Sequence, residues 1–242
     1  MLGKTKTALL SATICAAVVI GCKEDNTAPP ATPKNPPAAA SSAPSASSTA
    51  QTSGGFGPTT NVDVLLCDGK THVTVAPGTP GTAIAGSLMA EWVAKHPGST
   101  WEAEERERHT LVGAADNTGL VGQSAGQTYG KITAQDVDLW KTETERVATA
   151  GSSVFHDANQ LGSTVGVSCD MCHPHAANTH PETYPKFQQQ LGRVALLRDM
   201  INWCIEHPVR GKPLASDDPR MRALEAYITA QRKGKALEYG KH

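Results

Sequence analysis

The chain has 242 residues, a formal net charge of −1 at pH 7 and a hydrophobic content of 39%. A nearly neutral chain without a basic stripe offers no electrostatic surface for nucleic acid, so nucleic acid is excluded as a partner. The length allows one or two domains. The low hydrophobic content and the heavy use of Ala, Ser and Pro indicate that part of the chain buries no core.

The N-terminus has the parts of an export signal. Lys4 and Lys6 provide a positive start, and residues 8–20 form an apolar run too short to span a bilayer comfortably. The run ends in Val-Ile-Gly-Cys, which resembles a bacterial lipobox. This implies a signal peptide over residues 1–21, a lipid on Cys22, and a protein anchored at the periplasmic or cell-surface face of a bacterial membrane. The alternative is an ordinary signal peptide with a chance cysteine.

Two segments separate this signal from the C-terminal half. Residues 22–55 are rich in Ala, Pro, Ser and Thr without apolar periodicity. They predict a flexible, lipidated tether with polyproline II character. Residues 56–130 predict an N-terminal extension or small subdomain, with no motif that assigns it a role. Within it we expect a β-hairpin around Asp68-Gly69, a helix over residues 82–95 and a charged helix over residues 101–109.

Residues 169–173 read Cys-Asp-Met-Cys-His, the pattern that attaches c-type haem. Two thiols on one turn add to the two vinyl groups of haem, and the adjacent imidazole is presented to the iron from one face. Such attachment takes place outside the cytoplasm of bacteria, so the export signal and the motif support each other. We therefore predict one covalent haem c, attached to Cys169 and Cys172 with His173 as an axial ligand.

Two alternatives apply to any Cys-x-x-Cys pair. A zinc site needs a second pair of ligands, which His175 and His180 could nominally supply. A thioredoxin-like redox pair needs a βαβ context, which the sequence around the motif does not show.

The segments that flank the motif predict a helical cytochrome c domain over residues 131–242. Gly151 lies four residues before Phe155 on one predicted helix, where it permits close approach of another backbone. A second helix is predicted to begin at Asp218-Pro219 and carries Leu-Glu-Ala-Tyr at residues 224–227. These two segments resemble the crossed first and last helices of class I cytochromes c. The fold class implied is mainly α around the haem, with a small mixed N-terminal region.

The second axial position of the iron decides between electron transfer and substrate chemistry. The candidates downstream of the motif are Met200, Cys204, His207 and Met221. A helix predicted over residues 191–206 places Cys204 on an inward face, with Met200 beside it. A thiolate ligand would lower the reduction potential, whereas Met221 or Met200 as the fallback ligand would give a higher-potential carrier.

Cys204 also has a possible covalent partner. After signal cleavage and haem attachment, Cys67 and Cys204 are the two thiols that remain, and leftover thiols in an oxidising compartment often pair. Three interpretations of Cys204 therefore stay open: a haem ligand, a disulfide with Cys67, and a buried free thiol.

The block from residue 184 to 214 resembles a block in bacterial thiosulfate dehydrogenases and, more distantly, in the haem-bearing subunit of Sox cytochromes. It contains Tyr-Pro-Lys-Phe, Leu-Gly-Arg-Val, Ile-Asn-Trp-Cys and Arg-Gly-Lys-Pro-Leu. The resemblance covers roughly residues 151–234. It implies that Cys204 is the distal haem ligand and that Arg210 helps to bind an anionic sulfur substrate such as thiosulfate.

Three functional hypotheses follow. The first is an electron carrier with one haem that serves redox partner proteins. The second is a sulfur-oxidising enzyme with a haem ligated by His173 and Cys204, in which Cys204 and Arg210 are the catalytic residues. The third is a ligand-sensing cytochrome with an open distal site. Arg210 and Lys212 are also candidates for binding the haem propionates.

Overall fold

The computed structural model describes residues 58–107, 111–124 and 130–241. The expected signal peptide, Cys22 and the tether up to residue 55 lie outside these residues. All described residues belong to one structural unit, which spans residues 50–242. In these described parts, no helix is both long and apolar enough to cross a bilayer.

The N-terminal extension begins with the expected β-hairpin. Strands β1 (Val62–Leu65) and β2 (His72–Val75) pair antiparallel, with Val62 opposite Val75. The carboxylate of Asp68 accepts hydrogen bonds from the backbone N–H groups of Lys70 and Thr71, each at 2.8 Å, and Gly69 adopts a φ of +71°. The turn predicted at Asp68-Gly69 is therefore confirmed, and its side-chain hydrogen bonds explain why the chain reverses there.

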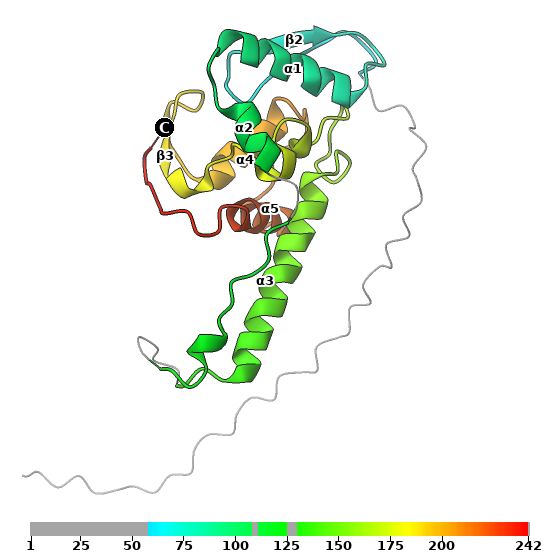
Figure 1. The fold of residues 1–242 in the computed structure, drawn as a ribbon. Helices are drawn as coiled ribbons and strands as arrows, with labels where there is room; N and C mark the ends of the chain where they lie inside the picture. The colour runs from blue at the N-terminus through cyan, green and yellow to red at the C-terminus, as the bar shows by residue number, and fades with distance from the viewer. Residues whose placement is uncertain (1–57, 108–110, 125–129, 242) are drawn as a thin grey trace, which may run out of the picture. The chain divides into compact units, whose positions relative to one another are not determined.

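Two helices follow the hairpin. Helix α1 (Gly81–Lys95) buries Ile84, Ala85 and Leu88 against the core of the unit. Helix α2 (Trp101–Glu107) is short and carries four glutamates among its seven residues. The helix predicted over residues 82–95 is thus confirmed, and the charged helix predicted over residues 101–109 is confirmed up to Glu107, since residues 108 and 109 lie outside the described residues. Figure 1 shows α1 beside the hairpin, with α2 between it and the C-terminal helices.

Two long helices form the frame of the C-terminal half. Helix α3 (Ala134–Phe155) begins with a capping box, in which Thr133 and Asp136 exchange hydrogen bonds. Helix α5 (Pro219–Ala230) begins at Asp218, whose side chain accepts from the N–H of Arg220 at 2.8 Å. These caps explain where both helices start.

The helices α3 and α5 cross at Gly151. A Cβ atom there would lie 1.9 Å from the carbonyl oxygen of Ala223 and 2.7 Å from the Cβ of Tyr227. One turn later, the rings of Phe155 and Tyr227 pack with centroids 5.1 Å apart. The crossed pair that the sequence suggested is therefore present, and the absence of a side chain at Gly151 is what permits the close approach.

The connection between α3 and α5 contains the haem-attachment motif, a second hairpin and helix α4 (Leu197–Glu206). Strands β3 (Lys186–Gln188) and β4 (Arg193–Ala195) form this hairpin. The helix predicted to begin at residue 191 therefore begins six residues later. The reason is that Arg193–Ala195 pairs with β3, and the backbone turns at Gly192, where φ is +64°. The described residues are otherwise mainly helical, as predicted.

Candidate haem site

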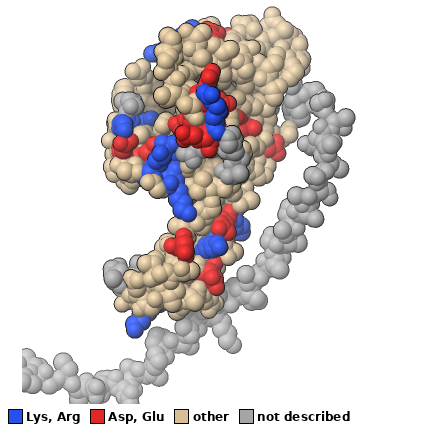
Figure 2. Space-filling view, viewed as in Figure 1, with Lys and Arg blue, Asp and Glu red and all other residues tan. Residues whose placement is uncertain are grey.

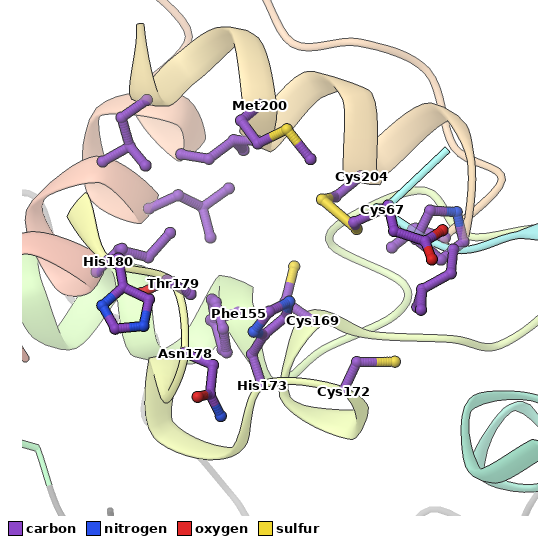
Figure 3. A pocket seen from close by; sticks show the side chains of 18 of the residues that line it. Cys67, Phe155, Cys169, Cys172, His173, Asn178, Thr179, His180, Met200 and Cys204 are labelled. Atoms are coloured by element: carbon purple, nitrogen blue, oxygen red, sulfur yellow. A yellow bond between two sulfur atoms is a disulfide. The ribbon is translucent and has the colours of Figure 1, made fainter. Parts of the chain in front are cut away.

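A cavity of about 240 Å³ lies between the Cys-x-x-Cys-His segment and α4 (Figure 3). Its apolar walls include Leu66, Trp92, Trp101, Phe155, Leu197 and Leu224. The volume is large compared with the about 30 Å³ that a water molecule occupies, and such apolar walls offer water few hydrogen-bond partners. The cavity therefore suits a large, mainly apolar group.

The two cysteines of the motif border this cavity as free thiols. Residues 169–171 form a single 3-10 turn, and the N–H of His173 donates to the carbonyl of Cys169 at 2.9 Å. This turn brings both thiols and the imidazole to one edge of the cavity. Burial raises the pKa of Cys169 and of Cys172 to about 12, so both sulfurs are protonated at neutral pH.

The imidazole of His173 is oriented for binding a metal. Its Nδ1 lies 2.9 Å from the carbonyl oxygen of Ala177. Because a carbonyl only accepts hydrogen bonds, Nδ1 carries the proton, and the lone pair of Nε2 is left for a metal ion. Burial lowers the pKa of His173, which keeps the ring neutral. A metal-ligating histidine requires this tautomer and this charge.

Side chains of α4 form the opposite wall, as Figure 3 shows for Met200 and Cys204. The thioether sulfur of Met200 accepts a hydrogen bond from Gln190 at 3.1 Å. The sulfur of Cys204 is bonded to Cys67, with a Cα–Cα distance of 5.3 Å. This is the second of the three interpretations of Cys204. In the disulfide form Cys204 has no thiolate to offer, so iron ligation by Cys204 stays a prediction that requires the disulfide to open.

The other downstream candidates lie away from the cavity. Met221 is fully buried, but helix α5 points it into the core, so the structure does not support it as a fallback ligand. His207 packs on Trp203, with ring centroids 3.6 Å apart. Of the methionines considered, Met200 is therefore the one that faces His173 across the cavity.

Arg210 and Lys212, the predicted partners of propionates or substrate, do not border the cavity. Both are exposed and follow the buried turn at Pro208-Val209, and the carbonyl of Arg210 accepts from Thr164 at 2.9 Å. This turn points the chain away from the cavity, which is the physical reason for the difference.

Lys186 provides a positive charge on the cavity wall and was missed by the sequence reasoning. Its ammonium group lies 4.9 Å from the centroid of the Tyr184 ring. Burial lowers the pKa of Lys186. The signal that would have identified it is its place in the Tyr-Pro-Lys-Phe element, where β3 begins. Its charge is suited to a carboxylate or another anion.

The zinc alternative finds no support in the described residues, since no three His, Cys, Asp or Glu side chains gather there to hold a metal ion. The thioredoxin alternative is not supported either, because the strands in these parts of the chain form two antiparallel hairpins and no βαβ unit. A haem brings its own four nitrogen ligands, so it needs only axial side chains such as His173.

A buried ion-pair network fixes α2 beside the site. The guanidinium of Arg232 contacts Glu104 of α2 at 2.5 Å and Glu182 at 2.6 Å. His180 on the cavity wall contacts Glu104 at 3.4 Å and Glu182 at 3.2 Å. The backbone N–H of Asn178 donates to Glu104 at 3.2 Å. This network thus ties α2 to the loop that follows the haem motif.

The pKa of Glu182 predicts a pH dependence of stability. Burial by itself would raise this pKa, but hydrogen bonds from Arg232 and His180 outweigh burial and lower it from 4.5 to about 2. Because the pKa is lower in the folded protein than in the unfolded chain, ionised Glu182 stabilises the fold above about pH 4.5. We expect this stabilisation, roughly 3 kcal/mol, to be lost as the pH falls from about 4.5 to about 2.

The Glu182→Gln variant tests this expectation. Its free energy of unfolding at neutral pH should be lower than that of the wild type, and the difference should shrink between pH 4.5 and 2. Denaturant titrations across this range measure it. The matched control is Glu238→Gln, which breaks the exposed pair with Lys241 and should have little effect. Parallel pH curves for wild type and Glu182→Gln would contradict the assignment.

The site combines two free thiols three positions apart with an imidazole of fixed tautomer, all at an apolar cavity between helices. This combination defines a c-type cytochrome domain. Residues 150–237 match the family model of the SoxA/TsdA cytochrome c domain. The C-terminal region is therefore a cytochrome c domain of the SoxA/TsdA type, which implies covalent haem c and export to the periplasm. This supports the resemblance predicted for residues 151–234.

One curated protein adds a more distant likeness. A thiosulfate dehydrogenase from Psychrobacter arcticus is 30% identical over 84 residues, which cover 31% of this chain and 26% of that protein. The chain therefore spans about a quarter of the length of the curated relative it matches. No solved structure shows a significant match. The family match does not include the first hairpin, α1 or α2.

Proposed function

We propose that this protein is a c-type cytochrome with one haem that transfers single electrons between redox proteins outside the cytoplasm. The observation that carries the proposal is the pair of free thiols beside His173, whose Nδ1 is held by the carbonyl of Ala177. Covalent haem at this site supplies one-electron redox chemistry. The chain contains one Cys-x-x-Cys-His motif, at residues 169–173, so we propose one haem.

The residues of the chain have separate roles in this proposal. His173 would hold the iron through Nε2, and the turn at residues 169–171 would set the two points of attachment. The apolar walls exclude water, which favours the less charged state of the redox centre. Lys186 provides a positive charge at the cavity for a propionate.

Met200 and Cys204 compete for the distal position. They lie one turn apart on α4 and both border the cavity opposite His173. The resemblance to sulfur-oxidising cytochromes favours Cys204, which must first be released from Cys67. While the disulfide is intact, Met200 is the available ligand. The oxidation state of the Cys67–Cys204 pair thus selects between a low-potential and a higher-potential cytochrome.

The Cys67→Ala variant tests this competition, because it frees the thiol of Cys204 without altering α4. We expect the near-infrared band of a low-spin thiolate haem and a lower potential than in the untreated wild type. The Cys204→Ala variant should instead show a methionine–iron band, and Met200→Leu in the Cys204→Ala background should remove that band. Electronic and EPR spectra measure these changes. If freeing Cys204 leaves the spectrum unchanged, Cys204 is not a ligand.

A second candidate function is the oxidation of thiosulfate or a related sulfur anion. It is supported by the SoxA/TsdA match and by the positive charge of Lys186 on the cavity wall. Cys204 would ligate the haem in this function, and Arg210 would have to move to reach a substrate in the cavity. With one haem, a partner protein would have to accept the released electrons one at a time. Thiosulfate-dependent reduction of the purified protein would distinguish this enzyme from a carrier.

We also propose that a lipid on Cys22 anchors the protein to a membrane and that residues 22–55 hold the cytochrome domain at a distance from the surface. The lipobox-like Val-Ile-Gly-Cys and the Ala, Pro and Ser composition support this proposal. Release of the protein from membranes by the Cys22→Ala substitution would support the anchor.

A further inference from the structure

A row of aromatic rings runs from His173 to the surface. The ring centroids of His173 and Trp101 are 5.0 Å apart, those of Trp101 and Trp92 are 5.0 Å apart, and those of Trp92 and His96 are 4.3 Å apart. These separations are typical of rings in direct contact. We call His173, Trp101, Trp92 and His96 the aromatic ladder. Its inner end is the predicted iron ligand, and its outer ring, His96, is exposed.

We propose that the aromatic ladder is the route by which electrons pass between the haem and a partner protein that docks over α1 and α2. This proposal rests on the proposed electron-transfer function. Electron tunnelling weakens steeply with the gap between groups, and rings in contact keep each gap short. Trp101 touches the predicted iron ligand directly, so the ladder begins at the redox centre.

The ladder is held in place by the rest of the domain. The side-chain amide of Asn178 donates to the carbonyl of Trp101 at 3.1 Å, which ties the second ring to the loop that follows His173. The contact between Arg232 and Glu104 fixes α2. At the outer end, Nδ1 of His96 lies 2.8 Å from the carbonyl of Trp92. Such constraints keep the rings in contact, as a defined electron route requires.

The surface around the outer end is acidic. Glu104 is paired with Arg232 and is left out of the count. The other charged residues of α1 and α2 are four carboxylates and two cations: Glu91, Glu102, Glu105 and Glu107, and Lys95 and Arg106. Asp68 is also close enough to His96 for their charges to interact. The sum is −2, from five carboxylates and three cations once Lys70 of the same turn as Asp68 is included, and Figure 2 shows red carboxylate side chains beside blue ones over α2. This charge fits a redox protein with a lysine-rich face.

Each transfer moves one electron. The iron beside His173 goes from Fe(II) to Fe(III), and the metal of the acceptor protein is reduced by the same electron. No bond is made or broken, and no proton has to move. Three of the four ladder residues, Trp92, His96 and Trp101, lie within α1, α2 and the segment between them, outside the family match at residues 150–237, whereas His173 lies inside it. The electron route is therefore an addition of this chain to the cytochrome domain.

The Trp92→Leu variant tests the ladder, because it removes a middle ring that does not touch His173. The experiment is stopped-flow oxidation of the ferrous holoprotein by a ferric, lysine-rich cytochrome c. We expect the rate to fall by an order of magnitude or more in Trp92→Leu and to stay near the wild-type rate in Trp92→Phe. The control is Trp140→Leu, which removes an exposed tryptophan on α3 and should change nothing. The wild-type rate should also fall with rising ionic strength.

Oxidation by ferricyanide and a potentiometric titration accompany each variant. Because Trp92 also borders the cavity, the potential and the ferricyanide rate of each variant correct for any change at the haem itself. A cytochrome c rate that, divided by the ferricyanide rate, falls in Trp92→Leu and not in Trp92→Phe supports the ladder. A wild-type rate in Trp92→Leu overturns it. Equal slowing in Trp92→Phe and Trp92→Leu also overturns it, because the aromatic ring would then not matter. A wild-type protein without a reducible haem would instead refute the proposed function, so the two failures are distinguishable.

Discussion

Replacing both Cys169 and Cys172 with alanine should abolish covalent haem and destabilise the fold by several kcal/mol. Without these thiols no covalent bond retains the group that fills the cavity of about 240 Å³, and axial ligation by His173 alone holds it weakly. A closed core cavity costs about 24 cal/mol per Å³, and because this cavity is partly open we expect a cost of several kcal/mol, below the roughly 6 kcal/mol of a closed cavity of the same volume. Since domains are typically stable by only about 5–15 kcal/mol, the variant should be largely unfolded or loosely packed at ambient temperature.

Two measurements check this expectation. The mass of the denatured protein, expressed with a haem-maturation system, should lose the haem increment, and thermal unfolding followed by circular dichroism should shift strongly downwards. Cys67→Ala is the control for the mass measurement, because it leaves both attachment points; it also removes the disulfide with Cys204, so it is not used as the control for thermal unfolding. A double variant that keeps haem after denaturation, or that melts at the temperature of the wild type, would refute the assigned site.

The Gly151→Ala substitution should be strongly destabilising although it adds only one methyl group. The new Cβ would lie 1.9 Å from the backbone oxygen of Ala223, and a backbone atom cannot rotate away. The helices α3 and α5 would have to separate, which would loosen the contact between Phe155 and Tyr227. Overpacking typically costs 1–3 kcal/mol, and we expect about 3 kcal/mol here because the clash is with backbone. The better helix propensity of alanine, worth about 1 kcal/mol, should not compensate.

The Gly86→Ala substitution is the matched control. Gly86 also lies within a helix, α1, but a Cβ there would meet no atom within 4 Å. Alanine at this position should therefore stabilise the protein by up to about 1 kcal/mol. Denaturant unfolding of the haem-loaded proteins measures both changes. Equal effects at the two glycines would mean that helix propensity, and not the crossing of α3 and α5, determines the outcome.

Local signals in the sequence were sufficient for several elements. The hairpin at Asp68-Gly69 was predictable because its turn is built from hydrogen bonds between residues two and three apart. Asp136 and Asp218 mark helix starts for the same reason. The carboxylate of Asp136 accepts from the backbone N–H of Thr133, and that of Asp218 accepts from the backbone N–H of Arg220. The start of α4 was not predictable in this way, because residues 193–195 form strand β4 and not helix. Their extended conformation comes from pairing with β3.

The distal side of the site was less predictable. Met200 and Met221 both lie on apolar helix faces, and only the packing of α4 and α5 decides that Met200 borders the cavity. Arg210 follows α4 in sequence but is carried away from the cavity by the turn at Pro208-Val209. Periodicity gives the face of a helix, but it does not say which neighbour that face will meet.

By itself, the sequence determined the haem-attachment chemistry, because two thiols and an imidazole within five consecutive residues share one turn whatever the rest of the chain does. Only the tertiary structure decided which side chains from distant segments lie around these thiols and this imidazole. It brings α4 opposite His173, joins Cys204 to Cys67 across 137 residues, and places Trp101 against the imidazole. Contacts between distant segments depend on how all the helices pack together, and that packing is a property of the whole fold.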